Sequence, residues 1–309
     1  MKRVLVTGGA GFIGSHLVHA LVQRGDQVRV LDNFSSGSPV NLAGVQDQIE
    51  LHQGDLRQAD DVRAAVKDVD IIFHEAAFVS VPQSLEDPAE CYATNVDGTI
   101  HLLEAARAAG VRQVVLASSA AVYGSLDNFP LRESGPTQSL SPYAASKHMT
   151  ETLAELYTAS FGLPVTALRY FNVYGPRQSP TSAYAAAIPR FMHSVQAGQA
   201  PMVFGDGTQT RDFVFVGDVV RANLLAAETP AAAGRAINVC SGAETRLLDL
   251  LDVLYSLYPD APQPQFAPAR AGDVPRSLGD PTLAAEVLGF RAEVSLSEGL
   301  RQCSQETRA

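Results

Sequence analysis

Two serines, a tyrosine and a lysine in the middle of the chain carry side chains that could act on a hydroxyl group. Ser118 and Ser119 end an apolar stretch, and Tyr143 and Lys147 follow in a segment with helical spacing. Because Tyr143 and Lys147 are four positions apart, they share one face of a helix. An ammonium group beside a phenol favours the phenolate, which can take up a proton. A solvent-facing Tyr/Lys pair and a serine cap would be the simpler interpretation.

A glycine-rich segment near the start of the chain predicts a dinucleotide site. The apolar strand Val4 to Val6 enters the turn Gly8-Gly9-Ala10-Gly11-Phe12-Ile13-Gly14, and apolar residues at helical spacing follow. Glycine lets the backbone turn tightly and approach a ligand, and the N–H groups at a helix start bind a pyrophosphate. A purely structural glycine turn is the alternative, but the strand before the turn and the helix after it favour the dinucleotide.

An acidic residue after the second strand selects the dinucleotide. The apolar run Val28 to Leu31 ends in Asp32, where a carboxylate would bond the ribose hydroxyls of NAD and repel the 2′-phosphate of NADP. With NAD as the cofactor, Tyr143 would take a proton from a sugar hydroxyl while hydride leaves the same carbon. Ser119 would hydrogen-bond that hydroxyl, and Lys147 would also hold the nicotinamide ribose.

Strand and helix patterns alternate along the rest of the first 170 residues, as in a parallel sheet with helices on both faces. Asp87-Pro88 and Gly110 mark the start and end of one helix, and Ser141-Pro142 and Gly162 bound another. The Ser-, Pro- and Gly-rich stretch 125–142 predicts a long functional loop. Further strands are expected at 49–51, 71–73, 114–117 and 165–170, and a further helix at 60–66.

This pattern predicts an α/β fold, with a Rossmann-type doubly wound parallel sheet and a smaller C-terminal α/β substrate domain. Residues 1–170 would form the NAD-binding domain. Residues 171–309 would form a discontinuous substrate domain, because part of this stretch, near 212–240, would return to the main sheet. The return would consist of a strand at 212–216, a helix at 218–229 and a strand at 236–239.

Composition restricts the compartment and the partners. The formal net charge of −10 argues against nucleic acid, whose binding calls for a basic surface, and an anionic substrate would need a local cluster of arginines. Three scattered cysteines, odd in number, predict no disulfide and no metal site, and they suit a reducing cytoplasm. The first apolar run is too short for a signal peptide, and no run reaches membrane-spanning length.

Taken together, the motifs resemble the extended short-chain dehydrogenase/reductase family nearly end to end. The resemblance rests on the glycine turn and on Asp32-Asn33, Asp55-Leu56, His74 to Ala77, Ser118 to Gly124, Tyr143 to Lys147 and Arg169 to Gly175. Within the family, the chain is most similar to the UDP-hexose 4-epimerases. Those enzymes use a tightly held NAD to oxidise C4 of the sugar, let the 4-keto sugar rotate, and return hydride to its other face.

Two alanines separate this branch from its relatives. The family's nucleotide-sugar 4,6-dehydratases carry an acid pair where Ala120 and Ala121 stand, and its UDP-glucuronate decarboxylases carry a glutamate where Ala121 stands. Alanine cannot transfer a proton. The resemblance therefore favours epimerisation, which has no net redox change.

The resemblance also assigns a cofactor side and a substrate side to the site. On the cofactor side it implies Gly8, Gly11, Phe12, Ile13, Asp32, Asn33, Asp55, Leu56, Ala76, Ala77, Asn95, Tyr143, Lys147 and Tyr170. On the substrate side it implies Ser80, Ser118, Asn172, Phe204, Arg211, Arg270, Asp273 and Ser277. His74 is expected to be a structural residue at the end of a strand.

Each substrate-side residue has an implied partner on a UDP-sugar. Asn172, Arg211 and Arg270 would grip the diphosphate, because guanidinium groups suit bidentate phosphate contacts. Surface salt bridges would explain either arginine alone. Asp273 would bond the uridine ribose, and Phe204 would line the uracil pocket.

The size of one residue predicts how wide the sugar pocket is. Ser277 matches a position that faces the C2 substituent of the sugar, where a tyrosine narrows the pocket in related epimerases. A serine leaves room for an N-acetyl group, and Ser80-Val81-Pro82 also resembles the acetyl-tolerant enzymes. Space permits such a substrate without selecting it.

Two other functions remain compatible with the sequence: an NAD-binding sensor without catalysis, and a dehydrogenase or reductase that exchanges its cofactor. The intact Ser119, Tyr143 and Lys147 weigh against the sensor. The family often forms homodimers through a four-helix arrangement of the helices that match 87–110 and 142–161, so a homodimer is expected.

Overall fold

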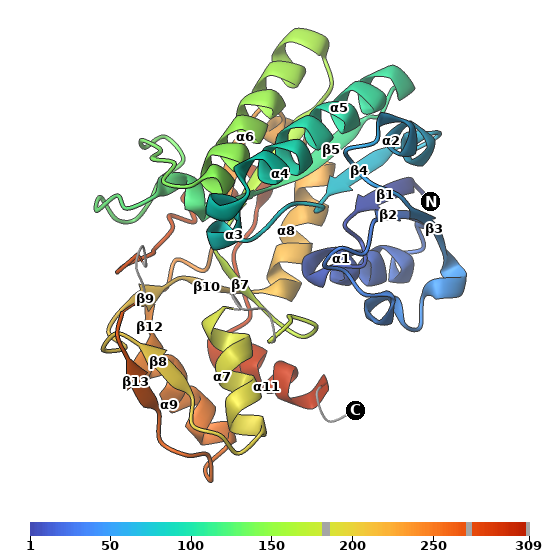
Figure 1. Ribbon diagram of the computed structural model, residues 1–309. Coiled ribbons are helices and arrows are strands. Elements are labelled where there is room, and N and C mark those ends of the chain that lie inside the picture. Colours follow the sequence, from blue (N-terminus) through green and yellow to red (C-terminus); the bar gives the residue numbers. More distant parts are fainter. Residues whose placement is uncertain (181–185, 270–273, 307–309) are drawn as a thin grey trace.

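The computed structural model describes residues 1–180, 186–269 and 274–306, and its centre is a seven-stranded parallel sheet. The strands lie in the order β11-β6-β5-β4-β1-β2-β3 (Figure 1). Their bounds are β1 Arg3–Thr7, β2 Gln27–Asp32, β3 Ile49–Gln53, β4 Ile71–His74, β5 Gln113–Ser119, β6 Val165–Tyr170 and β11 Ala236–Val239. The order reverses between β4 and β1, and ligands of such sheets bind at this switch point.

Alternate residues of the inner strands face two separate cores, which confirms the predicted doubly wound sheet. In β1, Val4 and Val6 pack in one apolar cluster and Leu5 in the other. The first cluster contains residues of α1 (Phe12–Gln23) and α8 (Val216–Glu228), and the second contains residues of α2 (Ala59–Val66), α5 (Gly98–Ala109) and α6 (Pro142–Phe161). Figure 1 shows α5 and α6 on one side of the sheet and α1 and α8 on the other. The central strands β1, β4 and β6 are covered on both faces and are mostly apolar, whereas the edge strand β3 is largely exposed.

The helix predicted between Asp87 and Gly110 contains an irregular turn. Its parts α4 (Pro88–Tyr92) and α5 are joined by a π-helical turn, Ala93–Asp97. Asn95 lies in this turn, and its amide bonds groups outside its own helix. We attribute the turn to these bonds, which hydrophobic periodicity does not reveal.

The C-terminal half adds three short strand pairs and several helices, in the lower part of Figure 1. The pairs are β7 (Asn172–Tyr174) with β10 (Phe213–Phe215), β8 (Met202–Phe204) with β13 (Gln265–Ala267), and β9 (Thr210–Arg211) with β12 (Thr245–Arg246). The remaining helices of this half are α7 Ala187–Gln196, α9 Leu247–Leu257, α10 Thr282–Leu288 and α11 Leu296–Glu306, and a short helix of the N-terminal half is α3 Val81–Glu86. Residues of α7, α9 and α11 share a third apolar cluster with β8 and β10.

The predicted return of the chain to the main sheet is confirmed for a helix and a strand. α8 and β11 occupy the expected ranges, and β11 pairs in parallel with β6. The strand expected at 212–216 does not join that sheet, because β10 pairs with β7 instead. The buried carboxylate of Asp212 holds the chain there, since it accepts bonds from Ser241, Gly242 and Gly279. The division into domains 1–170 and 171–309 stays a prediction.

Candidate active site

The glycine turn lies where the ends of β1 and β4 approach each other, and it has no space for side chains. Gly8 has a φ of 68°, and a Cβ there would lie 2.6 Å from the backbone nitrogen of Ala76. A Cβ on Gly14 would lie 2.1 Å from the carbonyl oxygen of Gly8. Gly11 begins α1 without a side-chain cap, and the half-buried Phe12 and Ile13 follow it. The closely packed glycine turn and the uncapped start of α1 therefore fit the pyrophosphate of a dinucleotide.

Asp32 lies at the end of β2, beside the glycine turn. Its two carboxylate oxygens accept hydrogen bonds from the N–H groups of Ala10, at 2.9 Å, and Phe34, at 2.8 Å. Its exposure is only 7%. These bonds fix the carboxylate next to the place where a ribose would continue from the pyrophosphate.

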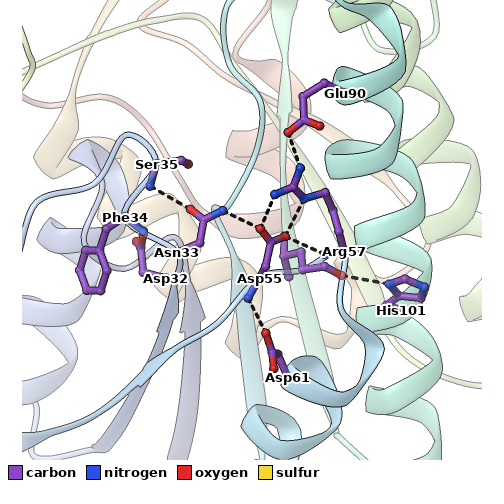
Figure 2. A network of polar contacts seen from close by, with 10 residues as sticks. Asp32, Asn33, Phe34, Ser35, Asp55, Arg57, Asp61, Glu90 and His101 are labelled. Carbon is purple, nitrogen blue, oxygen red and sulfur yellow. Dashed lines mark hydrogen bonds and ion pairs between the residues drawn. The ribbon is translucent and has the colours of Figure 1, made fainter.

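Asp55 is the centre of the polar network in Figure 2, beyond the end of β3. Its carboxylate accepts bonds from Nε and Nη2 of Arg57, at 2.9 and 2.6 Å, and from Nδ2 of Asn33 at 3.0 Å. Arg57 also pairs with Glu90 of α4 at 2.6 Å, and its bond to Asp55 holds the pKa of that carboxyl well below its usual value. The neighbouring Leu56 is buried. Sequence analysis missed Arg57, although an arginine two positions after Asp55 was a visible signal.

Asn95 holds the segment that follows β4. It accepts a bond from the N–H of Phe78 at 2.7 Å, and it donates to the carbonyl oxygen of Phe78 at 3.1 Å and to Oγ of Ser146 at 2.8 Å. Both ends of the amide are therefore bound to protein atoms. The half-buried Ala76 and Ala77 lie in the segment that Asn95 positions.

Ser119, Tyr143 and Lys147 come together at the carboxyl end of β5. The N–H of Tyr143 donates to Oγ of Ser84 at 3.2 Å, which ties the start of α6 to α3. The hydroxyl of Ser119 is near enough to the phenol of Tyr143 to act on its pKa. Nζ of Lys147 donates to the carbonyl oxygen of Ala117, in β5, at 2.7 Å. Ser119, at the end of β5, thus lies near the α6 segment that carries Tyr143 and Lys147.

Burial controls the pKa values of this group. It raises the pKa of the Tyr143 phenol, and the hydroxyl of Ser119 opposes it only in part. It lowers the pKa of Lys147 to about 8, although Glu75 acts in the opposite direction. The expectation that Lys147 lowers the pKa of Tyr143 is therefore not met by the chain itself, because burial of the phenol outweighs its neighbours. The second charge in that expectation, on the nicotinamide ring, belongs to the cofactor.

Tyr170, at the end of β6, has a hydroxyl that is bonded on both sides. It donates to Oε1 of Glu75 and accepts from Nδ2 of Asn223, both at 2.7 Å. A cofactor would therefore meet the ring of Tyr170 rather than its hydroxyl. Burial raises the pKa of Glu75 to about 7. Sequence analysis treated Glu75 only as part of a motif and assigned it no role.

Ser118 does not face this group. Its hydroxyl donates to the carboxylate of Glu151, which Arg169 binds at 2.8 Å through both Nε and Nη2. Nη1 of Arg169 also donates to the hydroxyl of Tyr123 at 2.8 Å. Ser118 is 3% exposed, so the structure does not support the substrate-binding role predicted for it.

His74, at the end of β4, is a structural residue, as expected. Its Nδ1 lies 2.7 Å from Oγ1 of Thr7, and its Nε2 lies 3.0 Å from Oγ1 of Thr99. Burial lowers the pKa of His74 to about 3, so the ring is neutral at neutral pH.

Three of the predicted substrate residues lie on short strands of the C-terminal half. Asn172 begins β7, Arg211 ends β9 and Phe204 ends β8. The guanidinium of Arg190 stacks 5.1 Å from the ring centre of Phe204. Phe204 also borders a cavity of about 440 Å³, whose lining includes Gln209, Thr210, Glu244, Pro275 and Arg276. An aromatic ring at the edge of such a cavity suits a planar base.

The other substrate predictions lie at the edges of the described chain. Ser80 caps α3, since its Oγ accepts from the N–H of Gln83 at 3.3 Å, so it begins a helix rather than lying in a loop. Ser277 is half-buried. Arg270 and Asp273 lie outside the residues that the structure describes.

The described part of the chain offers neither a metal-binding cluster nor a membrane-spanning helix. No cluster of three or more His, Cys, Asp or Glu side chains there could hold a metal ion. Cys91, Cys240 and Cys303 are buried and form no disulfide with one another. Within the same ranges, every helix is too short or too polar to span a membrane.

A family comparison identifies the chain. The model of the NAD dependent epimerase/dehydratase family matches residues 4–240. The chain belongs to this family. Its cofactor is therefore NAD, and the resemblance drawn from the motifs is confirmed.

Relatives of this family member cover nearly its full length. The UDP-glucose 4-epimerase of Mycolicibacterium smegmatis is 42% identical over 303 residues, which are 96% of each chain. The UDP-N-acetyl-alpha-D-glucosaminuronate decarboxylase of Bacillus cytotoxicus is 35% identical over 316 residues, covering 98% of this chain and 97% of its own.

Solved structures of similar proteins confirm the fold. The UDP-glucose 4-epimerase of Thermotoga maritima with UDP-glucose has a TM-score of 0.94 at 37% identity, covering 99% of this chain and 98% of its own. The UDP-N-acetylglucosamine 4-epimerase of Methanobrevibacter ruminantium, in complex with UDP-N-acetylmuramic acid, has a TM-score of 0.93 at 36% identity, with 99% of both chains covered. The Thermus thermophilus UDP-glucose 4-epimerase with NAD has a TM-score of 0.90 at 37% identity, again with 99% of both covered.

Proposed function

We propose that the chain is an NAD-dependent 4-epimerase that interconverts UDP-glucose and UDP-galactose. The observation that carries this proposal is the convergence of Ser119, Tyr143 and Lys147 at the carboxyl end of β5, two strands from the strand that leads into the glycine turn. Ala120 and Ala121 follow Ser119, so two positions that are acidic in the family's dehydratases cannot transfer a proton. The similarity to UDP-glucose 4-epimerases over the full chain supports the same choice.

The three side chains divide the work on one sugar hydroxyl. When bound, NAD would supply the hydride acceptor for C4, so that this carbon could be oxidised and then reduced again. As the phenolate, which the positive charge of the nicotinamide ring would favour once NAD is bound, Tyr143 would accept the proton of the C4 hydroxyl and would return it after the sugar has rotated. Ser119 hydrogen-bonds the same oxygen, and Lys147, anchored on Ala117, places a positive charge beside it. The same base serves both directions, so no net oxidation results.

The rest of the site would hold the two nucleotides. We assign the pyrophosphate of NAD to the glycine turn, its adenosine ribose to Asp32 and Asn33, and its adenine to the pocket at Asp55 and Leu56. Ala76, Ala77, Asn95 and Tyr170 complete the cofactor side, and Tyr170 presents its ring. On the substrate side, Asn172, Arg211 and Arg270 would bind the diphosphate, and Phe204 and Asp273 the uridine.

Two measurements on the purified enzyme test the function. Incubation with UDP-glucose or with UDP-galactose should give the same mixture of both, resolved by chromatography. A substrate carrying deuterium at C4 should keep the label at C4 in the product, because hydride returns within one binding event. Loss of label to added NAD would indicate a dehydrogenase that releases its cofactor, and tightly held NAD without any turnover would indicate a sensor.

A wider substrate range has a specific motivation in Ser277. The structure is similar to a UDP-N-acetylglucosamine 4-epimerase, and a small residue at 277 would leave room for an acetylated C2 substituent. Ser277→Tyr should suppress turnover of UDP-N-acetylglucosamine and spare UDP-glucose, whereas Ser277→Ala, the matched control, should keep both. Equal loss on both substrates in the tyrosine variant would show that position 277 does not set the pocket width.

A homodimer through α4, α5 and α6 is the assembly we propose. α6 exposes Met149 at 46% and Leu156 at 46%, two apolar groups seven residues apart on one helix face that a second copy would cover, and Phe161, at 51%, is exposed near the end of the helix. Light scattering of the wild type should give twice the mass of one chain. The variant Leu156→Glu should give the mass of a single chain. A monomeric wild type would refute the assembly. The cytoplasmic location stays a prediction.

A further inference from the structure

Glu75 is a charged group in the middle of the site that the reaction described above does not use. It directly follows β4, its N–H donates to the carbonyl oxygen of Thr7 at 3.1 Å, and the residue is half-buried. β4 lies between β1, which leads into the glycine turn, and β5, whose Ala117 anchors Lys147. Glu75 therefore lies between the cofactor turn and the catalytic side chains.

Asn223 determines the direction of the hydrogen bonds that reach Glu75. Its Nδ2 lies 2.9 Å from the carbonyl oxygen of Val219 and 2.7 Å from the hydroxyl of Tyr170. A carbonyl oxygen only accepts, so the amide nitrogen donates to both groups. The Tyr170 hydroxyl has a single hydrogen, which must go to Oε1 of Glu75, 2.7 Å away. That oxygen is an acceptor, as in an ionised carboxylate.

The side-chain amide of Asn223 keeps this orientation although its oxygen makes no hydrogen bond to the described residues. Its Oδ1 is buried and finds no hydrogen-bond partner among the residues that the structure describes. Exchanging the amide oxygen and nitrogen would bring Oδ1 against the carbonyl oxygen of Val219, two acceptors in contact. The chain of bonds from Asn223 through Tyr170 therefore runs one way and favours the charged form of Glu75.

Lys147 is the cation that this carboxylate acts on. Its side chain is buried, and the hydrogen bond of Nζ is to a neutral group, the carbonyl oxygen of Ala117. Glu75 from the end of β4, Cys91 from α4 and Glu151 from α6 act on it electrostatically. The charge of Lys147 in turn lowers the pKa of His74, in β4.

Glu75 is the group in this set that is left to balance Lys147. Burial raises the pKa of the Cys91 thiol and lowers that of His74 to about 3, so both are neutral at neutral pH. Tyr143, one turn earlier on α6, is a neutral phenol because burial raises its pKa. Glu151 is already bound by a buried arginine through both carboxylate oxygens.

We propose that Glu75, held by Tyr170 and Asn223, is a positioning residue that keeps the ammonium group of Lys147 charged while the enzyme works. The role of that ammonium group in turnover rests on the proposed function, but the coupling of the two charges does not. Burial lowers the pKa of Lys147 to about 8 and raises that of Glu75 to about 7, and each group's charge opposes the effect of burial on the other. Without Glu75, Lys147 loses its proton closer to neutral pH.

The lysine content of the chain makes a direct test possible. Lys2, Lys67 and Lys147 are its three lysines, so ¹³C,¹⁵N-lysine labelling of the NAD-loaded protein gives three side-chain signals whose pH titration yields each pKa. In Glu75→Gln, the pKa of Lys147 should fall by about one pH unit or more, the usual effect of losing a nearby opposite charge. Lys2 and Lys67 serve as internal controls and should not change.

Activity and matched variants complete the test. With UDP-glucose, the alkaline limb of the kcat profile should move to lower pH together with the Lys147 titration, and Glu75→Asp, which restores the charge, should return both toward wild type. Glu133→Gln is the control, because the Glu133 carboxyl also has a pKa raised by burial but bonds Asn238 elsewhere in the fold. Its Lys147 titration should match wild type.

Each outcome decides the proposal. An unchanged Lys147 pKa in folded Glu75→Gln overturns it. If that variant does not fold, Asn223→Leu should give a smaller shift in the same direction, and no shift in that variant overturns the proposal. A lowered Lys147 pKa in a protein that lacks epimerase activity supports the charge coupling and refutes the proposed function instead.

Discussion

The substitution Glu151→Gln removes one charge from a buried ion pair that joins α6 to β6. Arg169 binds both carboxylate oxygens at 2.8 Å, and the two side chains are each 6% exposed. Glutamine has the same volume, but it turns an NH₂ group toward donors and leaves the arginine charge unbalanced. Removing one partner of a buried pair costs about 3–5 kcal/mol of unfolding free energy.

A matched change on the surface isolates the contribution of burial. Glu298 pairs with Arg301 on α11, where the two side chains are 38% and 55% exposed. Glu298→Gln makes the same chemical change in a solvated pair, and its cost should be much smaller because water and salt screen an exposed pair.

Thermal unfolding of both variants checks these magnitudes. With about 2.1 cal/mol/K of unfolding entropy per residue over 309 residues, Glu151→Gln should lower Tm by roughly 5–8 °C, and Glu298→Gln should lower it by clearly less. All samples need the same saturating NAD, because a ligand that binds the folded state raises Tm. Equal shifts in the two variants would refute the argument that burial determines the cost.

Three further changes test the site and its environment. Tyr143→Phe should lower turnover of UDP-glucose by about 10²–10⁴-fold while NAD stays bound, because it removes the proton acceptor; near-normal turnover would exclude Tyr143 as the base. Asp32→Ala should loosen NAD, since the ribose hydroxyls lose an acceptor, and unchanged NAD content after dialysis would contradict this assignment. Burial lowers the pKa of His74 from 6.5 to about 3, so protonation favours the unfolded chain as the pH falls between these values. This site should lower the unfolding free energy by up to about 1.4 kcal/mol per pH unit there, and His74→Asn should flatten the slope in acid-unfolding curves; identical slopes would count against it.

Local patterns made most of the fold predictable. Ser141 and Gly162 bounded α6 as observed, because caps act within a few residues. The partner of β10 could not be predicted, because its position depends on contacts of Asp212 with segments around 241 and 279. Hydrophobic periodicity carries no information on such distant bonds.

The candidate site was predictable where its groups are close in sequence. Tyr143 and Lys147 are one helical turn apart, so their shared face follows from geometry. Ser118 was assigned with its neighbour because a sequence does not show which of two adjacent serines finds a buried carboxylate. Glu75 was missed for a related reason, since its partners Tyr170 and Asn223 lie far along the chain.

The position of β11 at the edge of the sheet has a consequence for how the chain matures on the ribosome. β6 is buried along its whole length, and β11, which covers one edge of it, is made about 70 residues later. α8, which contributes Val219 and Val220 to the same core as α1, is also translated after β6. A nascent chain that ends at Tyr170 has an open strand edge and an uncovered apolar face, both prone to association with other chains. The nucleotide-binding sheet is therefore incomplete until residue 239 has left the exit tunnel. Premature termination between residues 170 and 239 leaves an aggregation-prone fragment rather than a smaller working domain.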